Sequence, residues 1–240
     1  MVDYSIIIPA YNEAELLPAT LVAVKQAMNA VTELQGEVIV VDNNSSDNTA
    51  ILATAAGVKV VTESINQISR ARNCGARAAS GRFILFLDAD TIISNELLQQ
   101  ALNNLQNENC CGGGALVDLS SKSSGLAVRT CIKLWNWFAL RRKLAAGCFI
   151  YCRYDAFAAI GGFSDKLYAG EELRFSRKIA NWGQQFDQSF LIIEAPHITT
   201  SARKEEWHSP FKLIVIMLFL MIFPPALRFK WCCAIWYKRP

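Results

Sequence analysis

The sequence reads Arg82-Phe-Ile-Leu-Phe-Leu-Asp88-Ala-Asp90-Thr91, and this stretch decides the fold. Its five apolar residues, 83–87, form an unbroken run, which is typical of a strand buried on both faces of a covered sheet. Asp88 and Asp90 follow at once. They are therefore predicted at the carboxyl end of that strand, where open α/β sheets place their ligand crevice.

Two carboxylates this close repel each other unless a cation lies between them. Oxygen ligands of this kind suit Mg²⁺ or Mn²⁺. A Mg²⁺ ion held by one or two carboxylates usually completes its shell with phosphate oxygens and water. Asp88 and Asp90 therefore predict a divalent metal that binds a diphosphate. In the alternative interpretation, Asp88 caps a turn and Asp90 caps the helix expected from Asn95.

The composition suits one large α/β domain, or one domain with an appendage. Of the 240 residues 52% are hydrophobic and 19% are charged, and the mean hydropathy is +0.20. Much of the apolar bias follows Pro210. The net charge of +3 does not indicate a nucleic-acid binder. The eight cysteines form no paired C-x-x-C set, and no signal peptide is recognised before the first strand, so we expect reduced thiols and a cytoplasmic protein.

The first half of the chain alternates strands with helices. Strands are expected at 4–8, 37–42, 58–62 and 83–87. Helices are expected at 14–31, from an N-cap at Ser46 or Asp47 to residue 56, and at 68–79. This rhythm predicts right-handed crossovers and a largely parallel sheet. The second half is less regular: it suggests helices at 95–106, 126–144, 155–160 and 170–180, and strands at 148–152 and 190–194, with the glycines 112–114 as a flexible lead into a strand.

Six motifs taken together resemble the family-2 inverting glycosyltransferases of the GT-A fold. They are Ser5-Ile-Ile-Ile-Pro-Ala-Tyr-Asn-Glu13, Val38-Ile-Val-Val-Asp42-Asn-Asn-Ser-Ser-Asp47, Arg70-Ala-Arg-Asn73-Cys-Gly75, Asp88-Ala-Asp90, Gly161-Gly-Phe163 and Gly170-Glu-Glu172. The resemblance covers about residues 4–204. It implies a Rossmann-like, mostly parallel central sheet flanked by helices. We assign 1–205 to the catalytic domain and 206–240 to an apolar and basic C-terminal segment.

The resemblance also implies an activity, which is metal-dependent transfer of a sugar, with inversion, from a nucleotide-diphosphate sugar to an acceptor hydroxyl. A UDP-sugar is the first choice of donor, and a glycan or lipid-linked molecule is the expected acceptor, with no nucleic acid involved. The loop 144–168 is expected to shape the acceptor site through Phe149 and Tyr151.

The resemblance assigns the donor to Pro9, Ala10, Tyr11, Glu13, Asp42, Arg72, Asn73, Asp88, Ala89 and Arg203. Asp42 would accept a hydrogen bond from the base, although an aspartate at a strand end can instead cap a helix. Arg72 and Asn73 would lie near the nucleotide or diphosphate. Arg203 would contact the diphosphate with its planar fork.

The metal, Mn²⁺ or Mg²⁺, is assigned to Asp88, Asp90 and His197, although a lone histidine can also be structural. The family places its general base at the second residue of a Glu-Asp pair at a helix start. This chain has Glu171-Glu172 there, so Glu172 is the expected base, with a side chain one methylene longer. In the alternative, both glutamates only favour the positive end of a helix dipole.

The C-terminal segment suggests contact with a membrane. A helix over 211–223 would span only about 20 Å of a bilayer core of about 30 Å, so no transmembrane helix is expected unless Pro224 and Pro225 are absorbed as a kink. Bases and aromatic residues follow up to 239. They favour peripheral contact through 209–239 with the inner face of the cytoplasmic membrane. The alternatives are a helix folded back on the domain and a homodimer interface.

Two other functions compete with sugar transfer. A sugar nucleotidyltransferase would need a glycine-rich phosphate loop after the first strand, and Pro9-Ala-Tyr-Asn-Glu13 contains no glycine. A non-catalytic nucleotide-sugar-binding protein on the same fold is favoured only by the glutamate at 172. The Asp88 and Asp90 pair argues against it.

Overall fold

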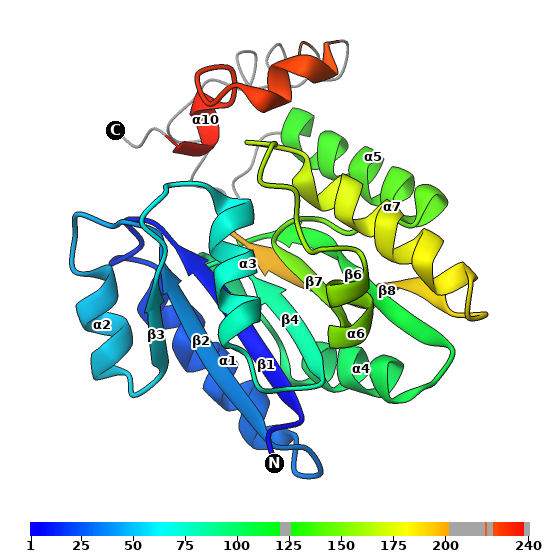
Figure 1. The fold of residues 1–240 in the computed structure, drawn as a ribbon, viewed down its shortest axis with the longest axis horizontal. Coiled ribbons are helices and arrows are strands. Elements are labelled where there is room, and N and C mark those ends of the chain that lie inside the picture. The colour runs from blue at the N-terminus through cyan, green and yellow to red at the C-terminus, as the bar shows by residue number, and fades with distance from the viewer. Residues whose placement is uncertain (121–125, 202–218, 220–222, 238–240) are drawn as a thin grey trace.

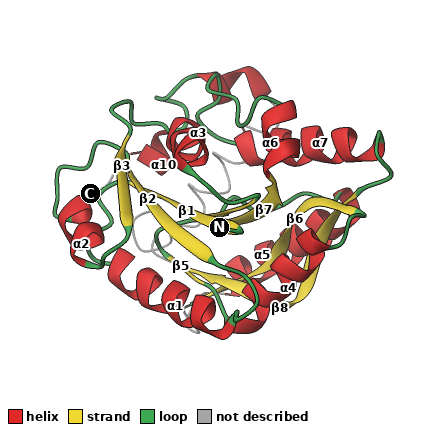
Figure 2. Ribbon diagram, turned by 60° about the horizontal axis from the view of Figure 1, so that its bottom comes forward, coloured by secondary structure: helices red, strands yellow, loops and turns green. Residues whose placement is uncertain are grey.

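The computed structural model describes residues 1–120, 126–201, 219 and 223–237. Its elements in chain order are β1 (Tyr4–Ala10), α1 (Leu17–Ala30), β2 (Gly36–Asp42), α2 (Thr49–Ala55), β3 (Lys59–Thr62), α3 (Ile68–Ala78), β4 (Phe83–Leu87), β5 (Thr91–Ile92), α4 (Asn95–Gln106), β6 (Cys110–Leu119), α5 (Leu126–Arg142), β7 (Phe149–Arg153), α6 (Tyr154–Ala159), α7 (Glu171–Gln184), β8 (Ser189–Thr200), η1 (Pro224–Arg228) and α10 (Ala234–Tyr237). One sheet runs through the molecule in the order β3-β2-β1-β4-β7-β6-β8-β5, with helices on both faces (Figures 1 and 2).

The strands β3, β2, β1 and β4 are parallel, as the alternation of strands and helices predicted. In register, Ala10 lies opposite Asp42, and Asp42 lies opposite Thr62. The loops that follow these strands therefore leave the sheet at one edge. β4 ends at the same edge, which places Asp88 beside the loops after β1 and β2. This edge carries the candidate site.

The other half of the sheet is mixed in direction. β7 runs antiparallel between β4 and β6, whereas β8 is parallel to β6 and antiparallel to β5. The glycines 112–114, which were expected as a flexible lead, lie inside β6. The physical reason is space, because a Cβ on Gly113 would collide with the carbonyl oxygen of Leu191 and one on Gly114 would lie 2.5 Å from the Cβ of Ala145. Glycine allows this close approach of backbones.

Two hydrophobic clusters fill the faces of the sheet. Figure 2 shows α1 and α4 on one face and α3, α6 and α7 on the other. On the second face, the ring of Phe86 meets that of Phe163 edge-on at 5.0 Å between centroids, and Phe163 stacks on Phe175 at 4.0 Å. This aromatic group packs the start of α7 against the centre of the sheet and so fixes the position of the helix that carries both glutamates.

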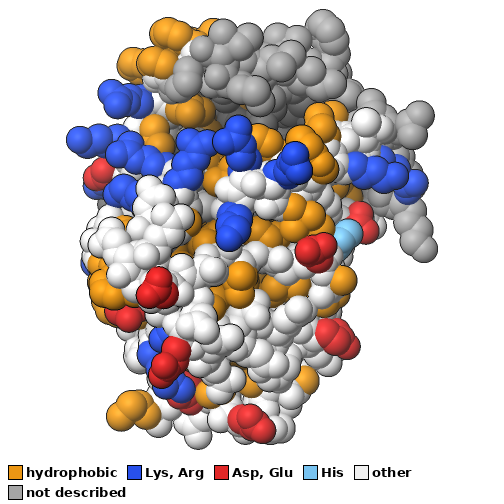
Figure 3. Space-filling model, turned by 90° about the vertical axis from the view of Figure 1, so that its right-hand side faces the viewer, with side chains coloured by type: hydrophobic (Ala, Val, Ile, Leu, Met, Phe, Trp, Pro, Cys, Tyr) orange, Lys and Arg blue, Asp and Glu red, His pale blue; other side chains and the backbone are white. Residues whose placement is uncertain are grey.

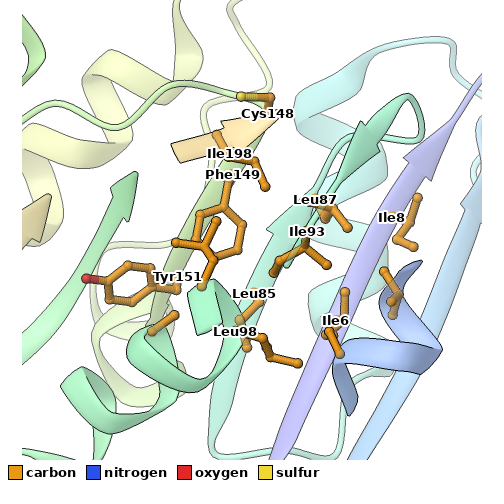
Figure 4. Close-up of a cluster of buried hydrophobic side chains, with 14 of the residues drawn as sticks. Ile6, Ile8, Leu85, Leu87, Ile93, Leu98, Cys148, Phe149, Tyr151 and Ile198 are labelled. Atoms are coloured by element: carbon orange, nitrogen blue, oxygen red, sulfur yellow. The ribbon is translucent and has the colours of Figure 1, made fainter. Parts of the chain in front are cut away.

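The expectation that Phe149 and Tyr151 shape the acceptor site is wrong. Both side chains lie in the cluster under α4, together with Leu85 and Leu87, and neither is exposed (Figure 4). The Tyr151 hydroxyl accepts a hydrogen bond from Asn104 and donates one to the carbonyl oxygen of Leu191. The residues 149–153 form a central strand between the two hydrophobic clusters, so the side chains on both of its faces are buried.

The described part of the C-terminal segment lies against the loop before α7. The Tyr168 amide donates to the carbonyl oxygen of Leu227 at 2.7 Å, and the Tyr237 hydroxyl donates to the carbonyl oxygen of Tyr168 at 3.0 Å. Ala226, Cys233 and Tyr237 are buried against Ala169. The segment thus braces the chain that leads into α7.

The helix expected over 211–223 falls almost wholly outside the described residues. Among the residues that are described, no helix is long and apolar enough to cross a bilayer.

Candidate active site

The turn of Asp88, Ala89 and Asp90 is held by elements from both halves of the chain. Thr20 of α1 donates its hydroxyl to the Ala89 carbonyl oxygen at 2.8 Å. The amide of Ser201, just after β8, donates to the Asp90 carbonyl oxygen at 3.1 Å. These bonds hold the backbone, so the turn presents its two carboxylates at a fixed place on the edge of the sheet.

The capping role considered for Asp90 is wrong. The N-cap of α4 is Ser94, whose hydroxyl accepts the amide of Leu97 at 3.2 Å. Asp90 lies four residues earlier, and the Thr91 hydroxyl approaches one of its carboxylate oxygens at 3.4 Å. The α4 helix therefore gives no reason for an aspartate at this position, and the metal role of Asp88 and Asp90 stays a prediction.

Arg72 lies at the centre of the site, and only 1% of its surface is exposed. One terminal nitrogen donates to Asp88 at 3.1 Å and to the carbonyl oxygen of Gly147 at 2.8 Å. The other donates to Glu171 at 2.7 Å. Burial lowers the pKa of Arg72, but the charges of Asp88, Glu171 and Glu172 outweigh it and raise the pKa, so the guanidinium stays charged. Arg72 thus joins Asp88 to the start of α7, while the expected position near the nucleotide or diphosphate stays a prediction.

The two glutamates at the start of α7 have different surroundings. Glu171 is buried and paired with Arg72, whereas Glu172 is half-buried and, within the described part of the chain, belongs to no ion pair. Burial, and then the charge of Glu171, raise the pKa of Glu172 to about 8. A Cβ at Gly147 would lie 3.8 Å from the carboxyl carbon of Glu172, so this carboxyl is next to the groups around Arg72. A carboxylate with a raised pKa suits a general base.

Asn73 binds protein backbone with both ends of its amide. Its nitrogen donates to the carbonyl oxygen of Phe163 at 2.9 Å, and its oxygen accepts the Phe163 amide at 2.9 Å. Gly162 has a left-handed backbone with φ of 67°, and a Cβ there would lie 2.6 Å from the Asn73 oxygen. Asn73 therefore fixes the Gly161-Gly162-Phe163 turn, while the nucleotide contact expected of it stays a prediction.

The loops after β1 and β2 are tied together. The Asn12 amide donates to the Ser45 hydroxyl at 3.0 Å, and the Asn12 side chain accepts the Ser46 amide at 2.8 Å. The amide of Glu13 donates to the Thr49 hydroxyl at 2.8 Å. These bonds give the edge of the sheet a fixed shape beside the candidate metal ligands.

The other residues assigned to the donor lie at this edge. Pro9 and Ala10 end β1, Tyr11 follows them half-buried, and Asp42 ends β2. One Asp42 oxygen accepts the Ser45 amide at 3.2 Å, which is a local turn contact. The structure thus brings these residues together, and their contacts with a nucleotide stay predictions.

The metal assignment rests on Asp88 and Asp90. His197 lies exposed in β8, and in the described ranges no group of three or more His, Cys, Asp or Glu side chains is arranged to hold a metal. The hard oxygen donors and the excess of carboxylates around Arg72 fit a divalent cation, with phosphate and water completing its shell. The role of His197 stays a prediction, and Arg203 lies outside the described residues.

Comparison with known proteins decides the family. A family model described as Glycosyl transferase family 2 matches residues 5–160. The chain belongs to glycosyl transferase family 2. This membership confirms the resemblance drawn from the six motifs, four of which lie within the matched residues.

Relatives in family 2 are similar over part of their length. Glycosyltransferase AglE of Haloferax volcanii is 26% identical over 194 residues, which cover 75% of this chain and 62% of AglE. The UDP-Glc:alpha-D-GlcNAc-diphosphoundecaprenol beta-1,3-glucosyltransferase WfgD of Escherichia coli is 39% identical over 114 residues, 45% of this chain and 44% of WfgD. This chain therefore spans less than two thirds of either relative.

A solved structure supports the fold. The mannosyltransferase PcManGT of Pyrobaculum calidifontis, in complex with GDP-Man and Mn²⁺, has a TM-score of 0.68 at 18% identity. The match covers 98% of this chain and 65% of PcManGT. Together with the family-2 match, it confirms the GT-A fold predicted from the sequence.

The sequence did not reveal two contributors to the site. Gly147 supplies a backbone carbonyl to Arg72, and only its place after Ala145-Ala146, a run of small residues before a strand, signals a close approach. Glu171 was expected to favour the positive end of the helix dipole or to be the next candidate for the base after Glu172. Its pairing with Arg72 joins positions 99 residues apart, and no local pattern indicates such a contact.

Proposed function

We propose that this chain transfers a sugar, with inversion, from a nucleotide-diphosphate sugar to an acceptor hydroxyl, using Mn²⁺ or Mg²⁺ bound at Asp88 and Asp90. The observation that carries the proposal is the cluster around Arg72. It joins a candidate metal ligand, Asp88, to the start of the helix that carries the candidate base, Glu172. Membership of glycosyl transferase family 2 supports the same class of reaction.

Each residue of the cluster has its own part in this reaction. Asp88 and Asp90 would hold a divalent metal, which when bound would supply positive charge at the leaving diphosphate. Glu172 accepts the proton of the acceptor hydroxyl, which attacks the anomeric carbon from the face opposite the diphosphate. Arg72 positions the site, because it compensates the charges of Asp88 and Glu171 and so allows a third carboxylate to lie next to them.

The donor and acceptor are proposed from relatives. WfgD is named for a UDP-Glc donor and a diphosphoundecaprenol-linked acceptor, which supports a UDP-sugar and a lipid-linked acceptor here. A membrane contact through 209–239, at the inner face of the cytoplasmic membrane, would suit such an acceptor. The exposed Phe229 and Trp231, beside the exposed Arg228 and Lys230, support that contact.

A second function follows from one departure. This chain has Glu172 where family 2 has an aspartate. If the longer side chain misplaces the carboxylate, the protein binds nucleotide sugars without transferring the sugar. Binding of a donor without release of nucleoside diphosphate distinguishes this function from catalysis.

The test is a donor screen with the full chain. UDP-, GDP- and dTDP-sugars are each added with Mn²⁺, and the thermal midpoint and the release of nucleoside diphosphate are measured. We expect one donor class to raise the midpoint and to be turned over, and EDTA to stop turnover. Asp90→Ala should lower turnover at least about a hundredfold, whereas Asp118→Ala, at an exposed carboxylate, should not. Undiminished turnover in EDTA would overturn the metal assignment.

A further inference from the structure

The outer side of α5 carries many bases and no acid. From Leu119 to Tyr154 the sequence contains no Asp or Glu. The exposed basic residues of this helix and of the position after it are Arg129, Lys133, Arg141, Arg142 and Lys143. The positive charge of this surface is therefore not compensated within its own segment.

The α7 helix extends this surface. The Ala145 amide, just after α5, donates to the hydroxyl of Ser176 at 3.1 Å, so the basic end of α5 lies against the middle of α7. There α7 exposes three further bases, Arg174, Arg177 and Lys178. Figure 3 shows a band of Lys and Arg across this side of the molecule, with hydrophobic side chains among them. We call the exposed basic residues of these two helices and Lys143 the α5–α7 basic face.

Large apolar side chains project from the same side of α5. Leu134 is 64% exposed and Trp137 is 56% exposed, and their spacing of three residues puts them on one face of the helix. Arg141 lies one turn further on, with its guanidinium 5.4 Å from the centroid of the Trp137 ring. The opposite side of α5 is fixed, because the side chain of Asn136 binds both the amide and the carbonyl oxygen of Val117. The apolar stripe is thus held facing outward.

We infer that the α5–α7 basic face binds the surface of an anionic lipid bilayer. Bases attract the anionic headgroups, and a tryptophan and a leucine between them enter the boundary with the acyl chains. The same Lys and Arg side chains would also attract a nucleic acid, but binding of a nucleic acid would not bury the exposed Leu134. This surface is made of other residues than 209–239, and its lipid binding does not require sugar transfer.

The α5–α7 basic face is directly connected to the candidate site. After Lys143, only three residues lead to Gly147, whose carbonyl oxygen binds Arg72 at 2.8 Å. Ser176, which binds the chain after α5, also donates its hydroxyl to the carbonyl oxygen of Glu172 at 2.8 Å. A bilayer bound at this face would therefore lie next to the edge of the sheet that carries the carboxylates, which is where a lipid-linked acceptor has to arrive.

The test measures sedimentation of the full chain with vesicles of phosphatidylcholine, with or without phosphatidylglycerol. We expect binding only to vesicles that contain phosphatidylglycerol. A chain carrying Arg141→Gln, Arg142→Gln and Lys143→Gln should bind these vesicles about a hundredfold more weakly, since each base near an anionic surface contributes about fivefold. Trp137→Ser, which keeps the charge, should bind several-fold more weakly.

The matched control carries Lys25→Gln, Lys59→Gln and Arg77→Gln, three exposed bases on α1, β3 and α3. It has the same net charge as the first variant and should bind like the unsubstituted chain. Circular dichroism and the thermal midpoint establish that each variant is folded. Undiminished binding by the α5 variant, an equal loss in the control, equal binding to vesicles without phosphatidylglycerol, or tighter binding to single-stranded RNA would each overturn the inference.

Discussion

The two halves of the sheet differ in the direction of their strands and in how far apart in sequence the paired strands are. β1, β2 and β3 each lie beside the strand next to them in the chain, and β4 then pairs with β1, so that all four strands are parallel. β7, β6, β8 and β5 run in mixed directions, and β5 pairs with a strand that begins about a hundred residues later. The first half follows from local pattern, whereas the second depends on long-range pairing. The candidate site lies where the halves meet, and Arg72 joins them.

Replacing Arg72 tests this junction most severely. Arg72→Met leaves Glu171 and Asp88 without their partner in a buried place, so we expect the free energy of unfolding to fall by about 3–5 kcal/mol and turnover to be lost. Denaturant unfolding measures the first effect. The control is Arg70→Met on the same helix, whose contact with Asp165 is 3.7 Å long and half-exposed and should be worth less than about 1 kcal/mol. Equal stability of the two variants would mean that strand pairing alone holds the halves together.

The two adjacent glutamates are expected to have different roles. Glu171 pairs with Arg72 where the halves of the sheet meet, and Glu172 is the proposed general base. Glu172→Gln should lower turnover at least about a hundredfold while donor binding is kept and stability is not reduced. Glu171→Gln should instead reduce stability, because it weakens the ion pair with Arg72. Steady-state kinetics and thermal unfolding on both variants separate the two effects. Near-normal turnover of Glu172→Gln would move the role of base to another residue.

The pH dependence should report on the same carboxyl. Because the pKa of Glu172 is raised to about 8, we expect turnover to increase as pH rises through that value and the base loses its proton. Stability should respond in the opposite sense. The folded chain holds this proton more tightly than the unfolded chain, so the contribution of Glu172 to stability is complete below its ordinary pKa and is lost as pH rises through the raised one.

Thermal unfolding in EDTA, measured from the ordinary pKa of glutamate up to the raised pKa of Glu172, shows whether stability falls as pH rises. The parent chain and Glu172→Gln are compared. The glutamine variant should lose less stability over this range. Glu194→Gln, at an exposed position of β8, serves as the control and should follow the parent. Parallel curves for the parent and Glu172→Gln would contradict the raised pKa.

The smallest expected effect comes from the core of the second half. Tyr151→Phe removes a hydroxyl that binds Asn104 and Leu191, so stability should fall by about 1 kcal/mol. Choice of acceptor should not change, because the side chain is fully buried. Competition between two acceptors measures this choice. A changed preference would restore the original view that this strand shapes the acceptor site.

These residues also show how far the sequence leads. The position of Asp88 was predictable, since an unbroken apolar run before a polar turn marks the end of a buried strand. Tyr151 was misjudged because β7 is buried on both faces, and the strands and helices that cover it come from distant parts of the sequence. The bonds from Asn73 to Phe163 were not predictable, because they join residues 90 positions apart in the chain. Gly113 was expected in a flexible lead but lies inside β6. The sequence around it does not indicate that Leu191 and Tyr151 leave no room for a side chain.

The ion pairs of Arg72 have a consequence for natural variation. One guanidinium compensates a carboxylate from each half of the chain, so loss of either position alone would leave a charge buried without its partner. Among descendants of this sequence, positions 72 and 171 should therefore covary, with arginine and glutamate kept or replaced together. Position 172 should alternate between aspartate and glutamate without regard to position 72.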